Sequence, residues 1–593
     1  MTMIANIPDQ IDKLRQAYRT GLRPETVIAD VFRRLEAVDD PGIFIHTDRE
    51  AALKAAKALG DYDGRPLWGI PFAVKDNIDV AGMPTTAACP DFAYTPDQDA
   101  FAVARLKAAG AICIGKTNLD QFATGLVGVR TPYPAPRNAV DPDIVPGGSS
   151  SGSAVAVAQG IVAFALGTDT AGSGRVPAAL NNIVGLKPTL GALSTSGVVP
   201  ACRSLDTVSV FAHSVADAWA VFDAAAAFDP EDAYSRPLPA PRLCGVPPVL
   251  RIGVPDAASL ETFGDTIQKD SFRKTLAMLK VNGAIISEMD FSPFYEVARL
   301  LYNGAWVAGR IAAIGDRLTT APDTLHPALR AVLEPGLKLT AADAFRDIYQ
   351  LRALERRCRD LMADIDLLCV PSIPTFVTVK EVEAEPIAAN SKLGTYTNFV
   401  NLLDLCAITV PTPPRADHRP GSVTLIAGKG RDALCAALAG RIEGNFGQSS
   451  GSQPVTDVQE DEIALAVCGA HMSGLPLNGE LTSRNARFLR RCRTAPRYSF
   501  HALAGGPPKR PGLVLEKDGG AAISVEIWAL PRAYFGDFID GIPAPLGIGT
   551  IHLDDGGTVK GFICEAGGLD GAEDISPLGD WRSYLSQHMS RGA

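Results

Sequence analysis

The stretch from Gly147 to Pro177, GGSSSGSAVAVAQGIVAFALGTDTAGSGRVP, constrains the fold of this chain more than any other. Two turns rich in glycine and serine, at 147–153 and 169–174, flank an apolar run at 154–167. Glycine lets the backbone bend tightly and approach a ligand closely. A turn of successive N–H groups that opens a helix is also a ready site for an anion or an oxyanion. We therefore predict that this stretch forms the floor of an active site.

Two other interpretations of the serine-rich turns are weaker. Glycine and serine are typical of a flexible spacer, but here the first turn leads directly into small apolar residues, which indicates a helix packed against other structure. A phosphate-binding loop would need a lysine beside the serine, in the pattern G-x-x-x-x-G-K-[ST]. The segment Ser151–Ala154 contains no lysine.

A nucleophilic serine needs a base, which is most often a histidine held by a carboxylate. None of the eight histidines lies between Thr47 and Ala212. Lys75 is the best other candidate, because it follows the apolar run Ile70–Val74 and would be buried at the end of a strand. Burial depresses the pKa of an amine, so a neutral lysine would be accessible near pH 7. The other interpretation of a lone lysine is a solvated surface charge.

Three blocks of sequence together resemble the amidase signature family of serine hydrolases. They are GIPFAVKDNIDVAG around Lys75, PGGSSSGSA around Ser149 and GTDTAGSGRVPAALNNIVGLKPT around Ser173. Later segments, LLCVPSIPT and NLLDLCAITVPTP, extend the resemblance over about residues 1–445. The resemblance implies a Ser-cisSer-Lys triad. Ser173 would attack an amide carbonyl, and Ser149, on a cis peptide, would relay the proton between Ser173 and neutral Lys75.

The same resemblance implies an oxyanion hole beside the nucleophile. It would be formed by four consecutive backbone N–H groups, those of Thr170, Ala171, Gly172 and Ser173. The loss of one such donor typically costs about a hundredfold or more in rate. We interpret Asp169, Arg175 and Asp206 as structural supports that hold these turns through charge-assisted hydrogen bonds.

The segment ARLLYNGAWVAGRIAAIGDR, at 298–317, indicates a class of substrate. Tyr302, Trp306 and Arg310 recur every four residues, so we expect them on one stripe of a helix that drifts about 80° over two turns. Taken alone, the pattern also fits an aromatic pair in the core with an arginine at its edge. With FATGLVGVRTPYPAPRNA at 122–139, however, it resembles the allophanate hydrolase branch of the family. That resemblance implies that Tyr302 and Arg310 recognise a small anion, and we place Gly125 in a small-residue loop that also binds substrate.

Allophanate is urea that carries a carboxylate, so its recognition depends on polar groups. The planar guanidinium of Arg310 can bind a carboxylate through two parallel hydrogen bonds. Attack by Ser173 on the ureido carbonyl would release ammonia, and the carboxylated carbamate would break down to carbon dioxide and a second ammonia. We expect no metal or organic cofactor. A urea carboxylase or enzymes of a cyanuric-acid pathway are the candidate partners upstream.

Composition bounds the fold class and the partners. Short apolar runs such as GIPFAV alternate with helical stretches such as AFAVARLKAAG, which predicts an α/β fold with a mixed central sheet covered by helices. The formal charge of −10 and the absence of basic runs argue against nucleic acid and anionic membranes. The eleven cysteines contain no C-x-x-C pair, and the N-terminal segment has no signal-peptide core. We therefore expect a reduced, cytoplasmic protein that spans no membrane.

The character of the sequence changes after residue 446. Residues 447–462, GQSSGSQPVTDVQEDE, lack apolar periodicity and are typical of an interdomain linker. We predict an amidase signature domain at 1–446 and a small α/β or mostly-β domain at 463–593. In the latter, Asp518–Gly520 and Asp554–Gly557 are typical of hairpin turns between paired strands.

The tail at 463–593 resembles the C-terminal domain of allophanate hydrolases, whose fold is related to γ-glutamyl cyclotransferases. His471 leaves its first strand at a glycine-flanked turn, and Glu526 lies in VEIWAL. A second site there would handle the carboxylated intermediate, with His471 donating a proton or steadying a leaving carboxylate. In the other interpretation His471 is a hydrogen-bonded loop residue and the domain serves assembly or stability. We also expect the domain to help form a homodimer.

Two further functions stay open on the sequence. The chain could be an amidase-signature enzyme that acts on another amide, including a glutamyl-tRNA amidotransferase A-type subunit. That subunit requires partner chains and normally lacks a tail like residues 463–593. The chain could also be a non-catalytic assembly protein, although intact Lys75, Ser149 and Ser173 argue against this.

Overall fold

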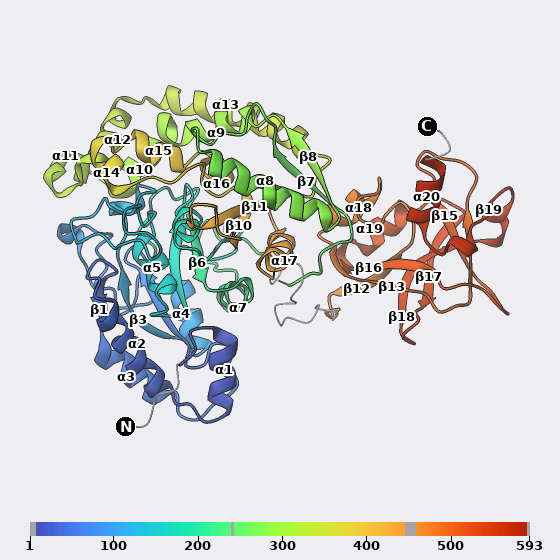
Figure 1. Cartoon of the computed structure of the whole chain (residues 1–593), viewed down its shortest axis with the longest axis horizontal. Coiled ribbons are helices and arrows are strands. Elements are labelled where there is room, and N and C mark those ends of the chain that lie inside the picture. Colours follow the sequence, from blue (N-terminus) through green and yellow to red (C-terminus); the bar gives the residue numbers. More distant parts are fainter. Residues whose placement is uncertain (1–6, 239–241, 445–457, 590–593) are drawn as a thin grey trace. The chain divides into compact units, whose positions relative to one another are not determined.

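The computed structural model of the chain describes residues 7–238, 242–444 and 458–589, and it divides into two compact units. The first unit consists of residues 1–242, 252–282 and 286–450, and the second of residues 243–251, 283–285 and 451–593. Figure 1 colours the last residues of the chain, which dominate the second unit, orange to red. Of the predicted linker, residues 447–457 lie outside the described residues, and Glu462 is already part of a strand.

The larger sheet has eleven strands among the described residues, in the order β1-β3-β2-β4-β6-β5-β10-β11-β9-β7-β8. Strand β2 pairs in parallel with β3 and β4, whereas β4 pairs antiparallel with β6, so the expected mixed sheet is confirmed. Its strands are β1 (Phe44–Thr47), β2 (Pro71–Lys75), β3 (Ile112–Thr117), β4 (Phe164–Asp169), β5 (Val184–Lys187), β6 (Thr207–Ala212), β7 (Leu250–Pro255), β8 (Ala284–Met289), β9 (Leu367–Pro371), β10 (Leu405–Thr412) and β11 (Gly421–Gly428).

Helices cover this sheet, and every residue of β2, β3, β4 and β6 is buried. Continuous apolar runs of this kind are typical of strands that are covered on both faces. In Figure 1 helix α3 lies beside β3, and α2 packs against α3. The helices are α1 (Ile11–Arg19), α2 (Pro24–Val38), α3 (Arg49–Ala58), α4 (Phe101–Ala108), α5 (Ser151–Ala158), α6 (Val176–Leu180), α7 (Val215–Ala225), α8 (Thr266–Val281), α9 (Ser292–Asn303), α10 (Ala305–Ile314), α11 (Arg317–Thr320), α12 (Pro327–Leu333), α13 (Ala341–Met362), α14 (Val379–Ala384), α15 (Ala388–Leu393), α16 (Asn398–Leu402) and α17 (Asp432–Glu443).

The stretch 147–177 folds as two turns that are joined by a helix and a strand. The first turn leads into α5, whose residues Ser151–Val157 are all buried, so a flexible spacer is excluded. Strand β4 follows, and the second turn connects β4 to α6. The second turn begins where β4 ends, and β4 pairs in parallel with β2, which ends at Lys75. The second turn and Lys75 therefore lie at the same edge of the sheet.

The expectation of one helix through Tyr302, Trp306 and Arg310 is wrong. Helix α9 ends at Asn303 and α10 begins at Ala305, with Gly304 in an extended conformation between them. Asp347 of α13 causes the break, because its Oδ2 accepts a hydrogen bond from Ala305 N–H at 2.7 Å and so caps α10. A side chain at 304 would lie 2.6 Å from the same oxygen.

The second unit contains a five-stranded sheet and a three-stranded sheet among the described residues, in the orders β13-β16-β12-β18-β17 and β15-β14-β19. A core that includes Trp528 and Trp581 packs between its elements. The elements are β12 (Glu462–Val467), α18 (Asn478–Thr482), β13 (Arg487–Arg493), β14 (Tyr498–Ala502), β15 (Pro511–Leu515), β16 (Ser524–Pro531), α19 (Phe535–Asp540), β17 (Leu546–His552), β18 (Thr558–Cys564), β19 (Glu573–Asp574) and α20 (Trp581–Met589).

One of the two predicted hairpins is confirmed. Strands β17 and β18 pair antiparallel on either side of Asp554–Gly557. The hairpin at Asp518–Gly520 is wrong, because β15 pairs with β14, whereas β16 pairs with β12 and β13. The turn instead carries the chain from one sheet to the other. In the part of the chain that the structure describes, no helix has the length and apolar character needed to cross a membrane.

Candidate active site

Lys75 is the last residue of β2, and its side chain is fully buried. Strand β2 lies between β3 and β4 in the interior of the sheet, so the amine at its end is shielded from solvent. The Nζ atom lies 2.7 Å from Ser149 Oγ and 2.7 Å from Thr168 Oγ1. Two hydroxyl groups, rather than a carboxylate, are thus its hydrogen-bond partners among the described residues.

Burial lowers the pKa of Lys75 from its ordinary value to about 7, because the ammonium loses its hydration in the interior. Three aspartates, Asp120, Asp206 and Asp169, act in the opposite direction by favouring the charged form. A large fraction of this amine is therefore neutral near neutral pH, and a neutral amine can accept a proton. The interpretation of Lys75 as a solvated surface charge is wrong.

Ser149 and Ser173 sit on the two turns of the stretch 147–177. The Gly148–Ser149 peptide bond is cis, and the Ser149 side chain is fully buried. Ser173 follows β4 and is 2% exposed. Within residues 7–238, 242–444 and 458–589, Ser149 Oγ is bonded to Lys75 but not to Ser173 Oγ. The hydrogen bond between Ser149 and Ser173 that the predicted triad implies is therefore not formed among the described residues.

The turn before Ser173 supplies backbone donors. Gly172 N–H donates to Asp169 Oδ1 at 2.9 Å and is therefore already engaged. The N–H groups of Thr170, Ala171 and Ser173 donate to no other described residue. Three of the four predicted oxyanion donors are thus available, whereas Gly172 serves to shape the turn.

Asp169 and Arg175 hold the turn that carries Ser173, as expected from the sequence. Arg175 donates from Nε and from Nη2 to the two Asp169 carboxylate oxygens, both at 2.9 Å, and both side chains are fully buried. Asn401 joins them by donating to the Asp169 carbonyl at 2.8 Å. Asp206 accepts from the Thr170 hydroxyl at 2.5 Å. Paired buried charges of this kind fix a turn firmly, because breaking one partner leaves the other unpaired.

Arg310 lies in α10, and only 1% of the residue is exposed. Its Nη1 donates to Thr124 Oγ1 at 3.1 Å, and its Nη2 donates to the Tyr302 hydroxyl at 3.4 Å. The guanidinium also stacks over the Tyr302 ring, 5.0 Å from the ring centre. Tyr302 and Arg310 therefore meet across the break at Gly304. No carboxylate pairs with Arg310 in the described part of the chain, and its buried Nε has no hydrogen-bond partner there.

Gly125 follows Thr124 in the loop that supplies this contact. A Cβ atom at Gly125 would overlap the Asp120 carboxylate, so only glycine fits. The next N–H group, that of Leu126, donates to Asn390 Oδ1 at 2.7 Å. Asn390 and Asp120 thus fix the loop around Gly125. The residue before Gly125 is Thr124, which contacts Arg310.

Sequence reasoning missed Thr168, Thr124 and Asn401. Thr168 is the second partner of the Lys75 amine, and it stands one residue before Asp169 in the block GTDTAGS. Thr124 is the hydroxyl partner of Arg310 and precedes Gly125. Both lie inside motifs that the sequence had marked, so a check of every hydroxyl in those motifs would have found them. Asn401 lies far along the chain, and nothing local indicates its role.

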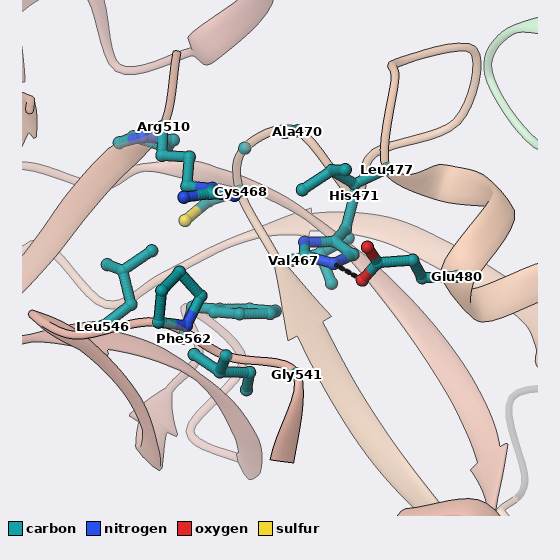
Figure 2. Close-up of a pocket in the computed structure, with 14 residues that line it drawn as sticks. Val467, Cys468, Ala470, His471, Leu477, Glu480, Arg510, Gly541, Leu546 and Phe562 are labelled. Carbon is teal, nitrogen blue, oxygen red and sulfur yellow. Dashed lines mark hydrogen bonds and ion pairs between the residues drawn. The ribbon is translucent and has the colours of Figure 1, made fainter. Parts of the chain in front are cut away.

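The second unit contains a separate pocket around His471 (Figure 2). The His471 ring stacks on Phe562, with ring centres 4.9 Å apart, and its Nε2 lies 2.9 Å from Glu480 Oε2. Burial lowers the pKa of His471, and Glu480 acts in the opposite direction. Arg510 lines the same pocket. The pocket therefore combines an imidazole, a carboxylate and a guanidinium.

Glu526 does not line this pocket. Its carboxylate is fully buried and accepts hydrogen bonds from Ser473 N–H and Arg582 Nη2, both at 2.7 Å. The Arg582–Glu526 ion pair fixes α20 against β16. Glu526 is therefore a structural residue, and the structure places only His471 of the two in a cavity.

Comparison with protein families assigns both units. Residues 26–436 match the model of the amidase family, and residues 463–586 match the model of the allophanate hydrolase C-terminal domain. The chain is 45% identical over 588 residues to a urea amidolyase from Lachancea kluyveri, covering 94% of this chain and 32% of the relative. The chain thus spans about a third of the length of that relative. The A-type chain of a glutamyl-tRNA(Gln) amidotransferase from Chloroflexus aggregans is 35% identical over 407 residues, covering 62% of this chain and 82% of the relative.

A solved structure, the selenomethionine-substituted allophanate hydrolase of Kluyveromyces lactis, matches both units together. Its TM-score is 0.77 at 41% identity, and the match covers 98% of this chain and 99% of that one. These similarities and the family matches identify an amide hydrolase. The chain belongs to the amidase signature family and carries an allophanate hydrolase C-terminal domain behind its amidase domain.

Proposed function

We propose that the chain is an allophanate hydrolase, which converts urea-1-carboxylate to ammonia and carbon dioxide. The observation that carries the proposal is the buried Arg310 guanidinium, which lies beside Tyr302 and Thr124 and has no acidic partner among the described residues. A buried charge is costly unless an opposite charge neutralises it. A small amide that bears a carboxylate meets this need. The similarity to an allophanate hydrolase of Kluyveromyces lactis supports the same substrate.

Ser173 is the nucleophile in this proposal. Its Oγ attacks the carbonyl of the ureido group, and its proton passes through Ser149 to the neutral Lys75 amine. The oxyanion that forms is stabilised by the N–H groups of Thr170, Ala171 and Ser173, which have no other described acceptor. Collapse of this intermediate breaks the C–N bond. The leaving amine takes the proton back through Ser149, so ammonia departs and an acyl-enzyme remains on Ser173.

Water then hydrolyses the acyl-enzyme, again with Lys75 and Ser149 moving the proton. The product is the carboxylated carbamate, and it breaks down to two molecules of carbon dioxide and a second ammonia. Each turnover therefore consumes one water and yields two ammonia molecules. The step needs no metal or organic cofactor, because the lysine, the two serines and the backbone donors supply the base, the nucleophile and the charge stabilisation.

The carboxylated carbamate is also the ligand proposed for the pocket of the second unit. Arg510 supplies a positive charge to that pocket, and His471, held by Glu480, supplies a group that can donate a proton or steady a leaving carboxylate. The rival interpretation, in which His471 is a structural loop residue, predicts that its substitution leaves turnover unchanged.

Chemistry that adds a carboxyl group to urea, or that opens a triazine ring, would supply this substrate. The enzymes of those reactions, a urea carboxylase or enzymes of a cyanuric-acid pathway, are therefore the proposed functional partners. The homodimer expected from the sequence stays a prediction.

A substrate panel tests the proposal. The purified full chain is incubated with allophanate, biuret, malonamate and simple neutral amides, and ammonia release is measured. We expect hydrolysis of allophanate at least a hundredfold more efficient than that of the neutral amides, because only anionic substrates pair with Arg310. Equal activity on neutral amides would instead favour a general amidase. Activity that appears only with added partner chains would favour an amidotransferase component.

A further inference from the structure

Asp120 is a fully buried carboxylate that the mechanism above does not use. It follows β3 and precedes the short helical turn Gln121–Ala123. Its Oδ1 accepts a hydrogen bond from Arg130 N–H at 2.9 Å, and its Oδ2 accepts one from Gly128 N–H at 3.0 Å. Both donors are backbone groups, and no lysine or arginine side chain forms an ion pair with Asp120 in the described ranges. A buried carboxylate with so few donors is costly, so its location calls for a physical explanation.

The same residue contacts both halves of the active site. Its N–H donates to the Ser149 carbonyl at 3.0 Å, so it holds the main chain of the proposed relay. A Cβ atom at Gly148 or at Gly125 would overlap the Asp120 carboxylate. Asp120 therefore packs between the turn that carries Ser149 and the loop in which Thr124 contacts Arg310.

We propose that Asp120 is a positioning residue that holds the Ser149 turn and the loop at 125–130 in one geometry, and that its charge favours proton uptake by Lys75. The inference rests on the proposed role of Lys75 as the base. In addition, Asp120 would connect the Lys75–Ser149 pair to the loop whose Thr124 contacts Arg310.

The charges around Lys75 support this assignment. Of the aspartates that raise the pKa of Lys75, Asp120 has the largest effect, ahead of Asp206 and Asp169. Asp169 is paired with Arg175, which offsets its charge. The titratable groups that interact electrostatically with Asp120 are Lys75, Arg130 and His326, from three different segments. Removal of the Asp120 charge should therefore lower the pKa of Lys75 further.

The test is the pH dependence of Ser173 labelling by a fluorophosphonate, measured on the full chain. The labelling rate should rise as Lys75 loses its proton, and it requires no particular substrate. In Asp120→Asn we expect the midpoint of this rise to move to lower pH by about half a unit or more. We also expect the maximal rate to fall about tenfold, because an amide offers one acceptor oxygen where Gly128 and Arg130 need two. An unchanged midpoint would overturn the proposal, since a purely structural role lowers the rate alone.

Asp432→Asn is the matched control. Asp432 is also a buried aspartate that accepts a backbone hydrogen bond, from Thr189 N–H at 2.8 Å, and it is not among the groups that act on Lys75. Its substitution should leave the midpoint where it is. A shift equal to that of Asp120→Asn would contradict the specific role of Asp120.

A second variant covers the case in which Asp120→Asn does not fold. Asp120→Glu keeps the charge but adds a methylene where Gly125 and Gly148 leave no room. We expect an unmoved midpoint and a maximal labelling rate at least tenfold lower. A labelling rate equal to that of the unaltered chain would overturn the positioning role. An unaltered chain that labels at Ser173 but leaves allophanate intact would refute the proposed substrate and not the role of Asp120.

Discussion

The amine of Lys75 lies 2.7 Å from the hydroxyl of Ser149, with both side chains fully buried. A buried amine that bonds to a hydroxyl instead of a carboxylate is poised to exchange a proton with it, because no carboxylate in direct contact holds it in the ammonium form. Lys75 ends one strand, and Ser149 precedes the helix that leads to the neighbouring strand. Their contact thus depends on the pairing of β2 with β4.

The first prediction concerns pH. Burial lowers the pKa of Lys75 to about 7, and in the proposed mechanism the neutral amine is the active form. kcat/KM for allophanate should therefore fall below this pH, as protonation removes the base, and should level off above it. A steady-state profile in overlapping buffers measures the limb. In Lys75→Ala the rate should drop by about four orders of magnitude and the limb should disappear. If the fall in kcat/KM at low pH persisted in Lys75→Ala, it would reflect the titration of a group other than Lys75.

The second prediction concerns substrate charge. Arg310→Gln removes the guanidinium and keeps a side chain that can donate to Thr124. We expect kcat/KM for allophanate to fall about a hundredfold, because a charge-assisted pair with the carboxylate is lost. Slow hydrolysis of a neutral amide should change by less than threefold. Arg346→Gln, at an exposed position of α13, is the control and should change neither. Equal losses on both substrates would make Arg310 structural.

The third prediction concerns Gly125. Gly125→Ala would push a methyl group into the Asp120 carboxylate and so displace the loop that carries Thr124. We expect KM for allophanate to rise at least tenfold and the protein to lose about 1–3 kcal/mol of unfolding free energy. Denaturant unfolding and steady-state kinetics measure the two effects. Gly440→Ala in α17 meets nothing closer than 4.0 Å and should leave KM unchanged. An unchanged KM in Gly125→Ala would show that this loop does not take part in substrate binding.

The fourth prediction separates the two units. His471→Asn keeps a polar side chain in the pocket of the second unit but removes the titrating ring. If the pocket processes the carboxylated carbamate, the first ammonia should appear at the usual rate while carbon dioxide release lags behind it. A chain truncated after residue 446 should show the same lag. Coincident release in both variants would favour a role for the second unit in assembly or stability.

Short motifs predicted the elements that carry the proposed catalytic residues, because the strand and the turns are visible in a few neighbouring residues each. Lys75 follows a strand-length apolar run, and Ser149 and Ser173 stand in turns whose glycines are visible in the sequence. The mixed sheet also followed from alternating apolar runs and helical stretches. The proposed catalytic residues therefore lie on elements that the sequence had already located.

Long-range contacts account for what the sequence did not predict. Helical periodicity continues through Gly304, but Asp347, 43 residues later, accepts a hydrogen bond from Ala305 N–H and so caps a new helix there. The turn at Asp518–Gly520 has hairpin composition, but the partners of β15 and β16 lie elsewhere in the chain. The Gly172 N–H group is engaged by Asp169 through a bond that composition cannot reveal. In each case the outcome depends on a hydrogen bond or strand pairing with a partner that the local sequence does not identify.

Ammonia release from allophanate by the purified full chain, with Ser173→Ala in parallel, tests the central claim most directly. We predict two ammonia molecules for each allophanate consumed by the unaltered chain. For Ser173→Ala we predict a folded protein that neither reacts with a fluorophosphonate nor turns over substrate. Turnover of allophanate by Ser173→Ala, or none by the unaltered chain under conditions in which Ser173 is labelled, would contradict the account.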